Sequence, residues 1–128
     1  MRFLCGLVCA VFLSTAAFAE SLSVTTFAGS DGGPGYRDGT GSAARFDSLF
    51  GVTVDGSGNV LVADSTAHTI RRITPSGVVS TFAGMAGEPG GTSGRRSVAR
   101  FRGPYAVAFD SSGNQYVAED DLRRISPS

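Results

Sequence analysis

Hydrophobic and polar residues alternate along this chain with a period of two, in short runs that are rich in valine and isoleucine. Gly, Ser, Asp, Asn and Pro separate the runs, a pattern typical of short β-strands joined by turns. The 3.6-residue period of a helix is almost absent. The pattern predicts an all-β chain with strands at residues 22–28, 51–55, 59–64, 69–74, 78–83, 105–110, 114–119 and 122–126.

The chain repeats part of itself at an offset of 55 residues. Residues 24–29 share Val, Thr, Phe, Ala and Gly with residues 79–84, and the Ala-Arg-Phe sequence at 44–46 recurs at the same offset. The match between residues 70–73 and 122–125 has an offset of 52, so the second copy is three residues shorter. A repeat of this length indicates one supersecondary unit stacked on a copy of itself.

Two kinds of turn separate the predicted strands. Residues 55–59 and 110–114 begin with an Asp, whose carboxylate can accept backbone N–H groups, and carry Gly where φ must be positive. In residues 74–77, Pro75 sets φ at the first corner and Gly77 closes the turn. These turns predict hairpins between antiparallel strands.

The N-terminal residues have a different character. A positively charged start, an apolar run at 3–13 and a small-x-small pattern that ends at Ala19 predict a signal peptide over residues 1–19. The mature chain, residues 20–128, is then one domain at most. We expect it to be secreted or periplasmic, without stable membrane insertion after cleavage.

Composition removes several classes of chemistry. Cys5 and Cys9 are the two cysteines and leave with the signal peptide, so thiol chemistry is not expected in the mature chain. Eleven basic and eleven acidic residues give a net charge of zero. The overall field therefore favours neither a polyanion nor a membrane surface.

The motifs that carry a family resemblance are residues 35–41, 44–46, 51–64, 68–75 and 77–84. As a set they resemble the NHL repeat, whose family builds six-bladed β-propellers from four-stranded antiparallel blades. The resemblance implies a partial propeller of about two such blades within residues 20–128, and makes the strand predicted at 22–28 equivalent to an outer blade strand.

Candidates for catalysis are few. His68 is the only histidine, and in an NHL-like repeat a His at this place belongs to the packing and hydrogen bonding of the repeat. A catalytic zinc ion usually has three protein ligands, which one His without Cys does not supply. We therefore assign no catalytic residue, no cofactor and no metal site.

One enzymatic alternative stays open. Residues 55–59 are followed neither by the Gly that comes after the third ligand of a calcium loop nor by its terminal bidentate Glu, so they are better interpreted as a hairpin turn. Calcium-dependent lactonases of the related gluconolactonase type place carboxylate ligands around a central channel. That resemblance makes Asp64 and Glu119, equivalent positions at strand ends, the first residues to test as metal ligands in a lactonase-like or lyase-like enzyme.

The glycine-rich stretches at 29–41 and 84–94 are predicted to be long inter-blade connections on one face, where many scaffolds carry function. They lack the P-loop pattern of a phosphate site. The candidate ligand-binding residues in and beside these connections are Tyr36, Arg37, Arg95, Arg96, Arg100 and Arg102. Export excludes a nucleic-acid partner, so an anionic glycan or an acidic protein is the more reachable ligand for the loop at 95–102, and a solvated charged loop is the default interpretation.

We thus expect an exported binding or scaffold module that mediates protein or glycan interactions. Two repeats do not close a six-bladed ring, so the chain is either a fragment of a longer propeller or a subunit that assembles one, with a homotrimer supplying six blades. In isolation the flanking faces, lined by Val52, Val62, Val107 and Val117, are expected to be exposed.

Overall fold

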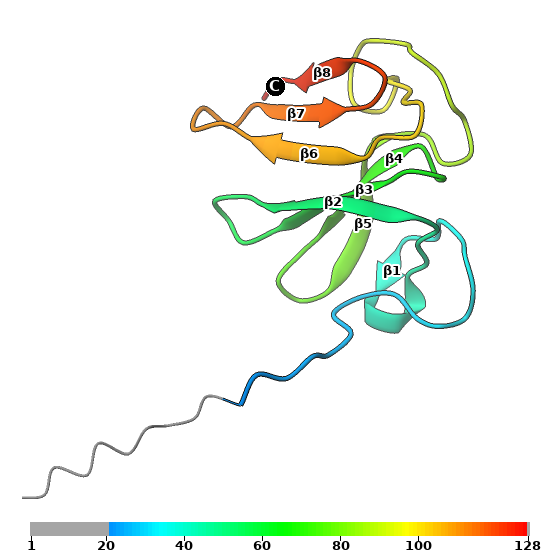
Figure 1. Ribbon diagram of the computed structural model, residues 1–128, viewed down its shortest axis with the longest axis vertical. Coiled ribbons are helices and arrows are strands. Elements are labelled where there is room, and N and C mark those ends of the chain that lie inside the picture. The colour runs from blue at the N-terminus through cyan, green and yellow to red at the C-terminus, as the bar shows by residue number, and fades with distance from the viewer. Residues whose placement is uncertain (1–20, 128) are drawn as a thin grey trace, which may run out of the picture.

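The computed structural model describes residues 21–127, so the predicted signal peptide, its cleavage site and both cysteines lie outside the described residues. Strands and one short 3-10 helix make up the regular structure of this part (Figure 1). None of its helical residues forms a segment long and apolar enough to cross a membrane. The elements in chain order are β1 (Gly39–Thr40), the 3-10 helix η1 (Gly41–Ala43), β2 (Leu49–Val54), β3 (Val60–Asp64), β4 (Thr69–Ile73), β5 (Val78–Gly84), β6 (Ala106–Phe109), β7 (Gln115–Ala118) and β8 (Leu122–Ile125).

These strands form two antiparallel sheets. The first has the order β1-β5-β4-β3-β2 and the second the order β6-β7-β8. Hairpins join consecutive strands from β2 to β5 and from β6 to β8, and the two sheets stack on each other (Figure 1). The predicted all-β fold class is confirmed. The arrangement is compatible with two consecutive blades of a partial propeller, the second with three strands.

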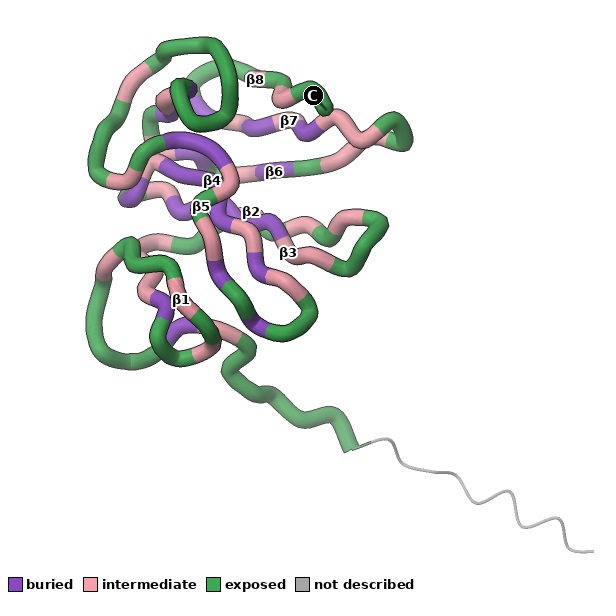
Figure 2. The backbone as a smooth tube through the Cα atoms, turned by 180° about the vertical axis from the view of Figure 1, so that it is seen from behind, coloured by how far each residue is buried: buried purple, intermediate pink, exposed green. Residues whose placement is uncertain are grey.

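Apolar side chains from both sheets meet between them, where Figure 2 shows the buried stretches. The first sheet contributes branched and small residues from β3, β4 and β5, and the second contributes two valines and the Phe that precedes β6. This core cluster consists of Leu61, Ala63, Ile70, Ala83, Phe101, Val107 and Val117. The opposite face of the first sheet has a smaller cluster of Ala44, Val62, Ile73 and Val79, partly covered by Ala28 and Phe46.

The expectation that four valines stay exposed is wrong for three of them. Val107 and Val117 are only 6% and 0% exposed, because they face the first sheet. Val62 is 4% exposed, because the segment before β2 covers it. Val52 alone of the four remains exposed, at 62%.

The two Asp-led turns have the expected geometry. Asp55 Oδ1 accepts the backbone N–H of Ser57 at 2.8 Å and of Asn59 at 2.9 Å, and the Asn59 side chain donates to Oδ2 at 2.9 Å. Gly58 has a φ of 80°. The bond from the Asn59 side chain is the main cause that lowers the pKa of Asp55, and Asp110, in the equivalent turn, has its pKa lowered by the equivalent Asn bond.

The edge strands β2 and β6 of the two sheets approach each other at a glycine. The backbone N–H of Gly51 in β2 donates to the carbonyl of Tyr105 at 2.8 Å. A Cβ atom at this position would lie 2.7 Å from the Cα of Ala106. The close approach of the two backbones therefore requires the absence of a side chain.

The prediction of a strand at residues 22–28 is wrong for the chain as described. These residues form no strand, and Leu22 and Val24 are 95% and 102% exposed. Figure 2 shows this segment as an exposed tube that leaves the body of the molecule. A strand is stable when its backbone groups pair with a neighbouring strand, and within residues 21–127 this segment pairs with none.

Candidate functional site: the connection-loop face

Two long connections lie on one side of the molecule. The first connection, residues 29–48, leads into β2, and the second connection, residues 85–105, joins β5 to β6. Both lie on the right in Figure 1, whereas the turns at 55–59 and 110–114 lie on the left. We call this side the connection-loop face.

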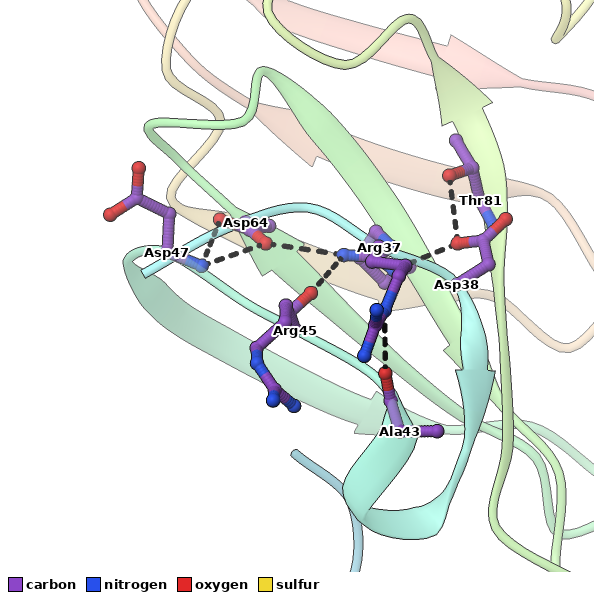
Figure 3. A network of polar contacts seen from close by, with 8 residues as sticks. Arg37, Asp38, Ala43, Arg45, Asp47, Asp64 and Thr81 are labelled. Atoms are coloured by element: carbon purple, nitrogen blue, oxygen red, sulfur yellow. Dashed lines mark hydrogen bonds and ion pairs between the residues drawn. The ribbon is translucent and has the colours of Figure 1, made fainter. Parts of the chain in front are cut away.

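A buried arginine attaches the first connection to the first sheet. Figure 3 labels its partners Asp38, Arg45 and Asp64. Arg71, in β4, is fully buried, and its guanidinium donates to Asp38 Oδ1 at 2.8 Å, to the Arg45 carbonyl at 3.0 Å and to Asp64 Oδ2 at 3.4 Å. It also lies over the ring of Phe46, 5.0 Å from the centroid. The planar guanidinium thus holds three points of one connection and the end of β3 at once.

The carboxylate of Asp64 completes this arrangement. It is fully buried and accepts the backbone N–H of Asp47 at 3.3 Å and that of Ser48 at 3.1 Å. A buried carboxylate is tolerable because the arginine and these two donors satisfy it. We call the Asp64–Arg71 pair and its contacts the first brace.

The second connection has the same arrangement. Arg123, in β8, donates to Glu119 Oε1 at 2.9 Å, to the Arg100 carbonyl at 3.2 Å and to Ser93 Oγ at 3.1 Å. The other oxygen of Glu119 accepts the backbone N–H of Arg102. Glu119 follows Asp64 at an offset of 55, and Ser93 follows Asp38 at the same offset. We call the Glu119–Arg123 pair and its contacts the second brace.

The braces bear directly on the residues named for a metal test. The carboxylate oxygens of Asp64 and Glu119 accept hydrogen bonds from an arginine and from backbone N–H groups, so hydrogen-bond donors occupy the positions where a metal ion would bind them. Within residues 21–127, no group of three His, Cys, Asp or Glu side chains is placed to hold a metal ion. The observed role of both carboxylates is to attach the connections to the sheets.

His68 has the structural role that the repeat implies. Its Nδ1 accepts the backbone N–H of Gly103 at 3.0 Å, so it links the end of the first sheet to the second connection. The proton of a neutral imidazole is then on Nε2. His68 also has a φ of +60°, which places it in the left-handed region at the β3–β4 turn.

The arginines predicted to bind a ligand fall into two groups. Arg100 is committed to the connection itself, because its guanidinium donates to the carbonyls of Val98 and Ala99 at 2.8 and 3.0 Å and pairs with Glu88 at 3.4 Å. Arg45, at the equivalent position, donates to the Ser42 and Ala44 carbonyls in the same way.

Arg95, Arg96 and Arg102 form the other group. All three are exposed, and within the described residues none of them forms an ion pair with a carboxylate. Arg96 lies over the ring of Phe82, with its guanidinium 4.4 Å from the centroid, and is the most constrained of the three. The second connection thus presents cationic side chains that its own structure does not neutralise.

Tyr36 and Arg37 belong to the first connection and are both exposed. Arg37 donates through Nε to the Ala43 carbonyl at 3.0 Å. The hydroxyl of Tyr36 approaches the second connection, where a Cβ on Gly87 would lie 3.4 Å from it. The structure therefore brings the two connections together at Tyr36.

A groove of about 1290 Å³ lies between β5 and β8, beside the second connection. Its lining includes the arginine pair Arg95–Arg96 and the apolar rings of Phe82 and Phe101, but no acidic residue. Three further arginines reach it from the strands, namely Arg72, Arg123 and Arg124. The sequence shows these arginines as separate clusters, and only the stacking of the sheets places them around one groove.

The chain is similar in structure to larger bacterial proteins. It matches a structural genomics protein of unknown function from Bacteroides thetaiotaomicron with a TM-score of 0.72 and 30% identity, over 77% of this chain and 26% of that one. It matches an auxiliary nutrient binding protein from Bacteroides ovatus with a TM-score of 0.70 and 30% identity, over 80% of this chain and 28% of that one. A putative phosphatase from B. thetaiotaomicron gives a TM-score of 0.71 and 28% identity, over 79% and 26%.

The chain spans about a quarter of the length of each of these proteins. No family model and no curated protein sequence matches it. Within residues 21–127 the chain is all-β, with two stacked antiparallel sheets whose connections are attached by arginine–carboxylate pairs.

Proposed function

We propose that the chain is an exported, non-catalytic binding module of the NHL-repeat β-propeller type, which contacts an anionic glycan or an acidic protein surface through its connection-loop face. The internal repeat and the stacking of two antiparallel sheets, of five and three strands, support the propeller type. Two similar structures are described as auxiliary nutrient binding proteins, which supports a binding role.

The main support for the proposal is that the second connection is held in place by hydrogen bonds while two of its arginine side chains stay exposed. The second brace holds the connection at Thr92, Ser93, Arg100 and Arg102. Between and beside these points the side chains of Arg95 and Arg96 are exposed. A ligand therefore meets cations whose backbone is already ordered, which lowers the entropic cost of binding.

Exposed apolar residues lie among the cations. Tyr36, Val98 and Tyr105 are each about half exposed, at 51%, 51% and 52%, and all belong to the two connections. Aromatic rings beside arginines are typical of surfaces that bind sugars or peptides, because a ring packs on an apolar face while an arginine holds a carboxylate or sulfate.

The test compares anionic and neutral polysaccharides. Binding of the mature chain to immobilised heparin and polygalacturonate should exceed its binding to dextran and should weaken as salt is raised, since exposed charges are screened. R95Q/R96Q should lose at least about tenfold in affinity, which corresponds to about 1.4 kcal/mol.

S57E/S112E is the control with the same change of net charge: both serines are exposed in the turns on the opposite side of the molecule (Figure 1), and this variant should retain binding. Equal losses in the two double variants would show that net charge, and not the connection-loop face, holds the ligand. An acidic protein library displayed on beads tests the protein arm with the same pair of variants. Failure to bind either class of probe contradicts the proposal.

A further inference from the structure

The groove between β5 and β8 has the position of a missing strand. In the first sheet, β4 pairs with β3 on one side and with β5 on the other. In the second sheet, β8 pairs with β7, and none of residues 21–127 pairs with its other edge. The groove lies along that uncovered edge, and Phe82 and Phe101 are among its lining residues.

A segment that matches such a strand is present in the same chain. Residues 24–29 share five residues with the part of β5 at 79–84, and β5 is the strand that covers β4. Within residues 21–127 this segment pairs with no strand, and Val24 is fully exposed although its equivalent, Val79, is 2% exposed. The segment thus carries the side chains of an outer strand without the environment of one.

The C-terminal end of the segment already has the geometry of β5. Gly29 has a φ of +93° and donates to the Gly41 carbonyl at 3.0 Å, while Gly84 has a φ of +88° and donates to the Arg96 carbonyl at 3.2 Å. Position 96 follows position 41 at the offset of the repeat. The backbone at the end of residues 23–28 therefore matches the backbone at the end of β5.

We infer that residues 23–29 of one copy form the fourth strand of the second sheet of another copy, by pairing with the outer edge of β8. The pairing of β4 with β5 gives the register, because Arg71 lies opposite Thr81, Arg72 opposite Ser80 and Ile73 opposite Val79. Translated by the repeat, Thr26 lies opposite Arg123, Thr25 opposite Arg124 and Val24 opposite Ile125.

The second brace is already shaped for this strand. In the first sheet, Thr81 of β5 donates its backbone N–H and its hydroxyl to Asp38 at 3.2 Å. The residue equivalent to Asp38 is Ser93, which accepts from Arg123 and has a further lone pair available. Thr26 of the incoming strand is the equivalent of Thr81 and is placed to donate to Ser93.

The faces beside the strand fit a head-to-tail contact. Val52 and Val54, 62% and 60% exposed, lie on the face of the first sheet that points away from the second. Their repeat partners, Val107 and Phe109, pack in the core cluster against the first sheet inside the chain. The internal stacking of the two sheets is therefore the template for stacking between copies. A head-to-tail contact of this kind closes when the rotation permits, and three copies of two sheets supply the six blades of a ring.

The first experiment measures the mass of the mature chain by light scattering. A compact trimer is expected, and a monomer or an open series of oligomers overturns the inference. V24D should dissociate the trimer, because it places a charge at the position where Val79 is buried in the first sheet. L22D is the matched control: Leu22 lies outside the strand segment and is 95% exposed, so this variant should remain trimeric.

The second experiment tests the register. The mature chain has no cysteine of its own, so T25C/R124C should form intermolecular disulfides under mild oxidation and give a covalent trimer on a non-reducing gel. T25C/S111C places the second thiol at the far turn and should not cross-link. Cross-linking of the control pair, or none in the matched pair, contradicts the proposed strand. V24D should still show the circular dichroism of a β-sheet, which separates loss of assembly from loss of folding.

Discussion

Replacing Arg71 by methionine should destabilise the chain strongly, and the structure shows which of its partners matters. Arg71 makes its shorter ion pair, at 2.8 Å, with Asp38, whose side chain is 51% exposed. Its longer pair, at 3.4 Å, is with Asp64, and both of those side chains are 0% exposed. Burial decides the energetics here, because solvent screens the Asp38 pair to about 0–1 kcal/mol.

Loss of the buried pair leaves the Asp64 carboxylate uncompensated except by two backbone N–H groups. Removing one partner of a buried ion pair costs about 3–5 kcal/mol. The cation–π contact with Phe46 adds to this a smaller amount, about 0.5–2 kcal/mol. R71M keeps an apolar side chain of similar length, so the expected loss reflects the charge and its hydrogen bonds rather than a cavity.

The assay is urea unfolding followed by circular dichroism, at one fixed protein concentration because assembly contributes to stability. R71M should lose about 3–5 kcal/mol of unfolding free energy, and D38N only about 0–1 kcal/mol. R72M, one residue along the same strand, is the control. The reasoning is refuted if R71M and R72M unfold at the same urea concentration, or if D38N costs as much as R71M.

Four further outcomes are expected. G51A should cost about 1–3 kcal/mol in the same unfolding assay, because its Cβ meets a neighbouring backbone at 2.7 Å, whereas G56A, with open space around it, should not. Because the pKa of Asp55 is lowered in the folded state, its carboxylate stabilises the fold fully above its unfolded pKa of about 3.8, and this stabilisation is lost as the pH falls through the folded pKa. The difference in unfolding free energy between D55A and the wild type should therefore shrink on acidification. Calcium and EDTA should leave the melting temperature unchanged; a calcium-dependent rise that D64A abolishes would favour the lactonase-like alternative. N-terminal sequencing of the exported protein should show cleavage after Ala19, and a chain that keeps its first residue would contradict export.

Local features of this protein follow from sequence alone because they depend on neighbouring residues. Seven of the eight predicted strands have counterparts in the structure, with ends that differ by up to two residues. The Asp-led turns form as expected, since each Asp bonds backbone groups two and four residues away. The repeat likewise predicts that Glu119 occupies the place of Asp64, as the two braces show.

Tertiary structure decided the features that depend on what each surface meets. Residues 24–29 carry the same pattern as residues 79–84, yet only the latter form a strand, because pairing requires an edge that lies beside the segment. Val52 and Val107 are likewise equivalent in sequence, yet Val52 is exposed and Val107 is buried, because within the described residues a neighbouring sheet covers only Val107. A pattern of side chains specifies the strand that a segment can form, and the presence of a partner determines whether it forms one.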